Sequence, residues 1–97
     1  MQQVPKPITK PSIDLFANLY QNKQKITMIT CYDYWSARLL AKTQIDCLLV
    51  GDSLAMVMHG HPSTIPADID MMCYHIAAVA RGAPNKFIVA DLPFLSY

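Results

Sequence analysis

Charged residues are scarce in this sequence, and neither sign predominates. Of its 97 residues, 15% are charged, and the formal net charge is +1. The eight basic residues are scattered and form no run, which argues against a surface that binds phosphates by charge. We therefore expect no nucleic-acid partner.

Long hydrophobic runs are also missing, although 53% of the residues are hydrophobic. No stretch approaches the roughly 18 uninterrupted apolar residues of a membrane span. The opening MQQVPKPITKP is rich in proline and lacks the apolar segment of a signal peptide. We expect an extended arm over residues 1–11, no membrane contact and a cytoplasmic location.

Cysteine and glycine are few, with three of each. Cys31, Cys47 and Cys73 form no CxxC pair and are odd in number, which argues against a zinc site and a disulfide framework. We expect reduced thiols that act as small core residues. The sequence also has no P-loop, no GxGxxG motif and no nucleophile elbow.

Hydrophobic periodicity and turn signals predict strands that alternate with helices. The expected strands lie over 26–30, 45–50 and 87–90, and a loop is expected over 56–70. The first expected helix covers 13–22 with Ser12 as its N-cap, and the second runs from its cap Asp33 to about Thr43. The third is capped by Asp68 or Asp70 and runs to about Ala80, with Gly82 just beyond it. This order implies parallel strands joined by crossovers, hence an α/β fold.

The central strand has a further signal. Cys47 to Val50 are apolar without alternation, which predicts burial on both faces in a parallel sheet. Three parallel strands form either a very small sheet or the beginning of a larger one. A (β/α)8 barrel, for comparison, needs about 250 residues.

Two aspartates directly follow apolar strands. Asp52 follows the strand over 45–50, and Asp91 follows the strand over 87–90. Parallel sheets bind ligands beyond the carboxyl ends of their strands, and neighbouring strands lie about 4.8 Å apart. A Mg²⁺ ion held by both carboxylates would relieve their repulsion. Alternatively, each aspartate caps the turn or helix that follows, and position alone leaves both possibilities open.

Three residues border these aspartates. Gly51 permits a sharp turn or the close approach of a ligand. Ser53 either donates a hydrogen bond to a bound carboxylate or caps a helix. Tyr32, at the end of the first strand, either packs at the rim or reaches the ligand with its hydroxyl.

The histidines carry weaker signals. His59 and His61, in HGH, could be read as a metal pair, but third and fourth ligands are missing, and a place on the loop surface is favoured. For His75, inside an expected helix, a partly buried packing role is favoured.

Four blocks in combination indicate a family. They are VGDSL over 50–54, GH-x-STIP over 60–66, RGAPN over 81–85 and ADLPF over 90–94. Over about residues 25–97 the sequence closely resembles the ketopantoate hydroxymethyltransferases of pantothenate biosynthesis. The resemblance implies a (β/α)8 TIM barrel, of which residues 1–97 form the N-terminal portion of a single domain, a helix followed by β-α-β-α-β.

The resemblance also implies an activity. A one-carbon unit passes from 5,10-methylenetetrahydrofolate to 3-methyl-2-oxobutanoate, giving 2-dehydropantoate through Mg²⁺-assisted enolate chemistry. The family's motifs place Asp52 and Asp91 at Mg²⁺ and, with Gly51 and Ser53, at the 2-oxo acid substrate; we add Tyr32 as a substrate-binding candidate. A homo-oligomer is implied as well.

Some family residues have no counterpart in these 97 residues. The substrate lysine, a further metal-site glutamate and the general base come from later strands, beyond Tyr97, so we expect the 97 residues alone to be inactive. In addition, Ala55 replaces a glycine that the family commonly has, which puts close backbone approach in question if that glycine takes a positive φ.

Two alternatives stand beside this interpretation. One is a truncated, non-catalytic fragment whose exposed strand edge needs a partner. The other is a different Mg²⁺-dependent enzyme of the same barrel that makes or breaks a carbon–carbon bond of a 2-oxo acid. The RGAPN and STIP blocks favour the transferase.

Overall fold

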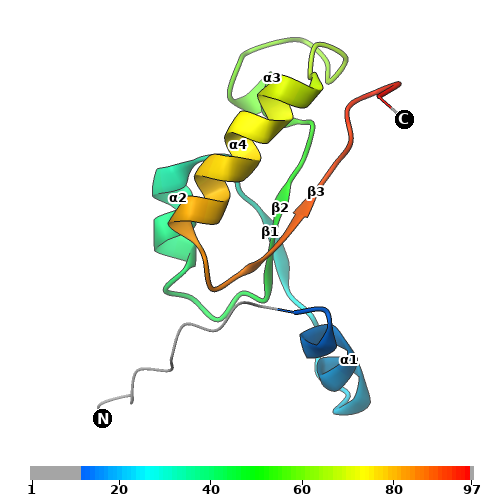
Figure 1. The fold of residues 1–97 in the computed structure, drawn as a ribbon, viewed down its shortest axis with the longest axis vertical. Coiled ribbons are helices and arrows are strands. Elements are labelled where there is room, and N and C mark those ends of the chain that lie inside the picture. The colour runs from blue at the N-terminus through cyan, green and yellow to red at the C-terminus, as the bar shows by residue number, and fades with distance from the viewer. Residues whose placement is uncertain (1–11, 97) are drawn as a thin grey trace.

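The computed structural model describes residues 12–96, and the arm expected over 1–11 lies outside them. Along this part of the chain the elements are α1 (Asp14–Gln21), β1 (Met28–Thr30), α2 (Tyr34–Leu40), β2 (Cys47–Val50), α3 (Leu54–Val57), α4 (Ile69–Gly82) and β3 (Phe87–Ala90). The strands form one parallel sheet in the order β1–β2–β3 (Figure 1). The expected α/β class with parallel strands is confirmed.

Strand β2 is the centre of the sheet. Its Leu48 is in register with Ile29 of β1 and Ile88 of β3. Three of the four β2 residues are buried and the fourth is half buried, as the uninterrupted apolar run predicts. All three residues of the edge strand β1 are exposed. The sheet is therefore buried at its central strand β2 and exposed at its edge strand β1.

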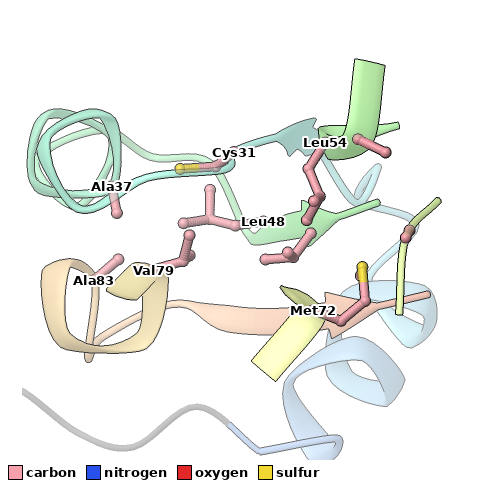
Figure 2. Close-up of a cluster of buried hydrophobic side chains, with 10 residues drawn as sticks. Cys31, Ala37, Leu48, Leu54, Met72, Val79 and Ala83 are labelled. Atoms are coloured by element: carbon pink, nitrogen blue, oxygen red, sulfur yellow. The ribbon is translucent and has the colours of Figure 1, made fainter. Parts of the chain in front are cut away.

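The hydrophobic core lies where α2 and α4 cover one face of the sheet (Figure 1). Figure 2 shows Leu48 of β2 in one cluster with Ala37 of α2 and Val79 of α4, and all three side chains are fully buried. Burial of one such leucine stabilises the fold by about 1.5–3 kcal/mol. The packing of these three elements holds β2, and so the residues that follow it, in place.

Two of the predicted helix caps are present. Asp33 Oδ2 accepts a hydrogen bond from the Ser36 amide at 2.8 Å, at the start of α2. Asp68 Oδ1 accepts one from the Met71 amide at 2.7 Å, at the start of α4. Each carboxylate satisfies an amide that has no partner within its helix. Between Asp68 and Asp70, the structure therefore selects Asp68 as the cap.

The predicted N-cap of the first helix, Ser12, was wrong. Ile13, not Ser12, is the N-cap residue of α1, and among residues 12–96 no side chain makes a capping hydrogen bond there. The Ser12 backbone carbonyl accepts from the Leu15 amide instead, so the turn closes without the hydroxyl. The helix then packs by an edge-to-face contact between Phe16 and Phe87 of β3, with ring centroids 4.7 Å apart.

The end of α2 also differs from the prediction. The helix stops at Leu40 rather than near Thr43. The Asn85 side-chain amide donates to the Ala41 carbonyl at 3.0 Å, and Lys86 Nζ donates to the Thr43 carbonyl at 2.6 Å. The chain after α4 thus binds the free carbonyls after α2, a long-range contact that local sequence does not reveal.

A short helix was missed and one glycine was misread. Residues after β2 form the single-turn helix α3, whereas loop was expected from residue 56. Gly82 lies in the last turn of α4 and not beyond it. A Cβ at Gly82 would lie 2.7 Å from both the Ala37 Cβ and the Tyr34 carbonyl oxygen. Gly82 therefore permits α4 to approach α2 closely, and its absent side chain serves packing.

Among the helices of residues 12–96, none is long and apolar enough to cross a membrane.

Replacing Gly82 by alanine is expected to destabilise the protein. Alanine in a helix is normally more favourable than glycine by about 0.5–1 kcal/mol. Here the new Cβ overlaps α2, so we expect the free energy of unfolding to fall by about 1–3 kcal/mol in urea denaturation. Cys73→Ala, at an exposed site on the same helix, is the control and should change stability by less than about 0.5 kcal/mol. A Gly82→Ala protein as stable as its parent would contradict the close packing.

The three cysteines should differ in reactivity. Burial raises the pKa of the Cys31 and Cys47 thiols, whereas Cys73 is exposed. Because the thiolate is the nucleophile, iodoacetamide should modify Cys73 at least about tenfold faster than the other two in the native protein. Peptide mass spectrometry over a time course measures this, and guanidinium should abolish the difference. Similar rates in the native protein would show that the two thiols are not buried.

Candidate functional site

The carboxyl ends of the three strands meet at one edge of the sheet. The backbone pairing continues past the strands themselves: the Cys31 amide donates to the Leu49 carbonyl at 2.9 Å, and the Asp91 amide donates to the Val50 carbonyl at 3.1 Å. These bonds hold the residues after β1 and β3 beside those after β2. The candidate residues therefore come together through parallel pairing, as expected.

The two aspartates lie next to each other. Asp91 Oδ2 accepts a hydrogen bond from the Asp52 backbone amide at 3.2 Å. The Asp52 residue is half buried, and Asp91 is exposed. Both belong to the same edge of the sheet, at the ends of adjacent strands. The two residues therefore lie side by side at this edge.

The capping alternative receives little support from the structure. Ser53 is the N-cap residue of α3, but its side chain makes no capping hydrogen bond. Within residues 12–96, the Asp52 carboxylate has no hydrogen bond that would tie it to the following helix. Asp91 does bind a backbone amide, but that amide belongs to the neighbouring strand end rather than to its own turn.

Glycine is favoured at position 51 because neighbouring side chains approach its backbone closely, and not because the backbone adopts an unusual conformation. It is buried, and its φ lies outside the left-handed region. A Cβ at this position would lie 3.2 Å from Asp91 Oδ2 and 3.4 Å from Ser53 Oγ. The missing side chain leaves room for the Asp91 carboxylate over the end of β2.

Tyr32 and Ser53 form a second pair at this site. The Tyr32 hydroxyl and Ser53 Oγ lie 2.7 Å apart, and either can donate. The hydrogen bond links the end of β1 to the start of α3, across 21 positions of sequence. Tyr32 also packs against the hydrophobic core, so the structure shows packing at the rim together with a hydroxyl that contacts Ser53.

Ala55 lies inside α3 and is fully buried. Among residues 12–96, the positive-φ positions are Lys23, Gly60 and Leu95. The backbone at Ala55 therefore suits alanine, and the question raised by its replacing glycine is answered.

The donor set at these strand ends fits a hard divalent cation only in part. Within the described residues, no group of three or more histidine, cysteine, aspartate or glutamate side chains could hold a metal. Two adjacent aspartates do suffice for Mg²⁺, which is typically held by one or two carboxylates together with waters and substrate oxygens.

One interaction near the site was missed. His59 is paired with His75, not with His61: their Nε2 atoms lie 2.9 Å apart. His75 Nδ1 lies 2.5 Å from the Tyr32 carbonyl oxygen. Because His59 and His75 are 16 positions apart and come from a loop and a helix, no spacing in the sequence signals the pair.

Comparison with known proteins gives a consistent result. The ketopantoate hydroxymethyltransferase family model matches residues 10–97. A Coxiella burnetii protein named 3-methyl-2-oxobutanoate hydroxymethyltransferase is 57% identical over 82 residues, 84% of this chain and 31% of the relative. Proteins of the same name from Bdellovibrio bacteriovorus and Leptospira interrogans are 58% and 54% identical, over 84% and 86% of this chain.

This chain spans about a third of the length of those relatives, 31% in each case. The matched region contains every candidate residue described above. On the extent of the family match and the identity to these relatives, the chain belongs to the ketopantoate hydroxymethyltransferase family.

Proposed function

We propose that this chain supplies part of the active site of a ketopantoate hydroxymethyltransferase. The reaction is transfer of a hydroxymethyl unit from 5,10-methylenetetrahydrofolate to 3-methyl-2-oxobutanoate, giving 2-dehydropantoate. Family membership and the names of the relatives support the activity. The observation that carries the proposal is the contact between Asp91 Oδ2 and the Asp52 amide, which brings two carboxylates to adjacent strand ends.

The two aspartates would hold Mg²⁺ together with the 2-oxo acid. When bound, the ion would act as a Lewis acid that polarises the keto group of the substrate. Asp52 and Asp91 supply oxygen ligands from two strands whose relative position is fixed by backbone pairing. Gly51 leaves the Asp91 carboxylate room to turn from the Asp52 amide toward a ligand.

Ser53 would bind the carboxylate of the 2-oxo acid. A hydroxyl has one proton to donate, and a carboxylate accepts only. If Tyr32 donates its proton to Ser53 Oγ, the Ser53 proton is free for the substrate. The 2.7 Å contact positions Ser53, and with Tyr32 as the donor it also leaves the Ser53 hydroxyl able to donate.

The proposal includes the fold to which the three-stranded sheet would belong. The three parallel strands would form part of a (β/α)8 barrel, in which further strands cover the open margins at β1 and β3. The general base and remaining ligands would come from such strands. A homo-oligomer with a cytoplasmic location completes the proposal, on the strength of the family alone.

Asp52→Asn and Asp91→Asn should each lower kcat/KM for 3-methyl-2-oxobutanoate by at least about 100-fold in the intact protein, because each removes an oxygen ligand of the proposed cation. Formation of 2-dehydropantoate at varied Mg²⁺ concentration measures this. Asp14→Asn, an exposed acid on α1, is the matched control and should leave turnover unchanged. Full activity in either site variant would rule out the assigned roles. The assay uses a protein that contains the later strands together with this chain, and absence of turnover in that protein would rule out the function.

Gly51→Ala should weaken the site without unfolding the protein. The new Cβ would lie 3.2 Å from Asp91 Oδ2, so the carboxylate must shift by a few tenths of an ångström. We expect about a tenfold rise in the Mg²⁺ concentration needed for half-maximal activity, since positioning of ligands is sensitive to small displacements.

Gly60→Ala provides the contrast to that variant. Gly60 has φ +74° and nothing within 4 Å of an added Cβ, so its replacement strains the backbone away from the site. It should lower stability by about 1 kcal/mol with no change in Mg²⁺ dependence. If both glycine variants affect only stability, Gly51 has no role in ligand positioning.

A further inference from the structure

We infer that His75 is a positioning residue for this site: it holds the main chain at Tyr32, and through Tyr32 the Ser53 hydroxyl, while His59 holds the His75 ring. The inference rests on the proposed function for its effect on turnover only. The contacts themselves are independent of any substrate.

The contacts form a continuous series from a helix to the candidate site. His59 Nε2 lies 2.9 Å from His75 Nε2, and His75 Nδ1 lies 2.5 Å from the Tyr32 carbonyl oxygen. The Tyr32 hydroxyl in turn lies 2.7 Å from Ser53 Oγ. Each of the two rings therefore has a hydrogen-bond partner at Nε2, and His75 has a partner at both of its ring nitrogens.

The Tyr32 carbonyl has a reason to need a side-chain partner. The last bond of the ladder between β1 and β2 on this side runs from the Cys31 amide to the Leu49 carbonyl. Tyr32 therefore lies just past the point where strand pairing supplies partners. A half-buried backbone carbonyl without a partner is unfavourable, and His75 supplies the donor.

The helix that carries His75 is well placed for this role. α4 is the longest helix of residues 12–96, with 14 residues, and it packs on α2 and on the sheet. His75 lies in its middle and is half buried. The rigid helix thus fixes the segment after the edge strand β1, whose own residues are exposed.

The partners determine the tautomers of both rings. A carbonyl oxygen only accepts, so His75 Nδ1 carries a hydrogen. In the neutral ring, Nε2 of His75 is then bare and accepts, so Nε2 of His59 must be the donor. His59 thereby opposes rotation of the His75 ring away from Tyr32.

A cavity of about 310 Å³ adjoins the pair, lined by His59, Asp68, Asp70, Met71, Tyr74 and His75. Asp68 is engaged with the Met71 amide through Oδ1. The remaining titratable neighbours in the cavity are Asp70 and Tyr74. None of these side chains takes the place of His75 at the Tyr32 carbonyl.

Two conservative variants separate the roles of the two nitrogens of His75. Asparagine places an amide nitrogen at the δ position, where it can still donate to Tyr32, but it does not reach His59. Glutamine places an amide nitrogen at the ε position, where it can reach His59 but leaves the Tyr32 carbonyl without its donor.

The intact protein should therefore respond differently to these variants. We expect His75→Gln to lower kcat/KM by about 10- to 100-fold and His75→Asn to stay within about threefold of the parent. His61→Gln, in the same loop as His59 but outside the pair, is the matched control and should change neither turnover nor spectra. Equal losses in the Asn and Gln variants would overturn the positioning role, because a merely structural histidine would not distinguish them.

Nuclear magnetic resonance tests the same inference without substrate. At about pH 8, where imidazole side chains are in general neutral, long-range ¹H–¹⁵N spectra should show Nδ1–H on His75 and Nε2–H on His59. His75→Gln should shift the Tyr32 ring and Ser53 amide signals, and His75→Asn should leave them near their original positions.

These results separate the inference from the proposed function. Absence of turnover in a parent protein that contains the later strands, with the expected tautomers and shifts, would remove the function and retain the positioning role. The opposite tautomer on His75, or unmoved Tyr32 and Ser53 signals in His75→Gln, would remove the positioning role whatever the activity.

Discussion

Parallel pairing of β2 with a strand on each side is the constraint from which the site follows. Parallel strands begin at one edge of the sheet and end at the other, so whatever follows each strand is brought to a common edge. The hydrogen bond from the Asp91 amide to the Val50 carbonyl extends that pairing to Asp91, the candidate site residue that follows β3. Burial of β2 beneath α2 and α4 makes the pairing stable, since a shift of register would expose its apolar residues.

Much of this arrangement could be predicted from the sequence because its signals are local. The apolar run of β2 and the carboxylates that cap α2 and α4 depend on residues within a few positions of one another. Asp52 and Asp91 could be placed at one edge because the alternation of strands and helices implies parallel strands. The order of elements alone is sufficient for that inference.

The remaining features depend on contacts between distant segments, which local patterns do not contain. Gly82 follows the pattern of a helix stop, but its actual constraint is the Ala37 Cβ on another helix. The end of α2 is set by Asn85 and Lys86, far along the chain. The hydrogen bond between His59 and His75 joins a loop to a helix. In each case the decisive partner becomes a neighbour only after the strands and helices have packed.

The triplet after β2 shows how these two kinds of information combine. Gly51, Asp52 and Ser53 end a buried central strand, and so they face neighbours on both sides. The Asp52 amide binds the Asp91 carboxylate from β3, and Ser53 binds the Tyr32 hydroxyl from the end of β1. A side chain on Gly51 would crowd both contacts, at 3.2 and 3.4 Å.

A glycine, an acid and a hydroxyl at this point therefore connect all three strand ends. The hydrogen bonds are made by a backbone amide and a serine side chain, which leaves the Asp52 carboxylate outside the connections. The atoms that connect the strand ends, the Asp52 amide and Ser53 Oγ, differ from the atoms of the Asp52 carboxylate in the same short segment. That separation lets the segment hold the sheet edge together while the Asp52 carboxylate takes no part in these hydrogen bonds.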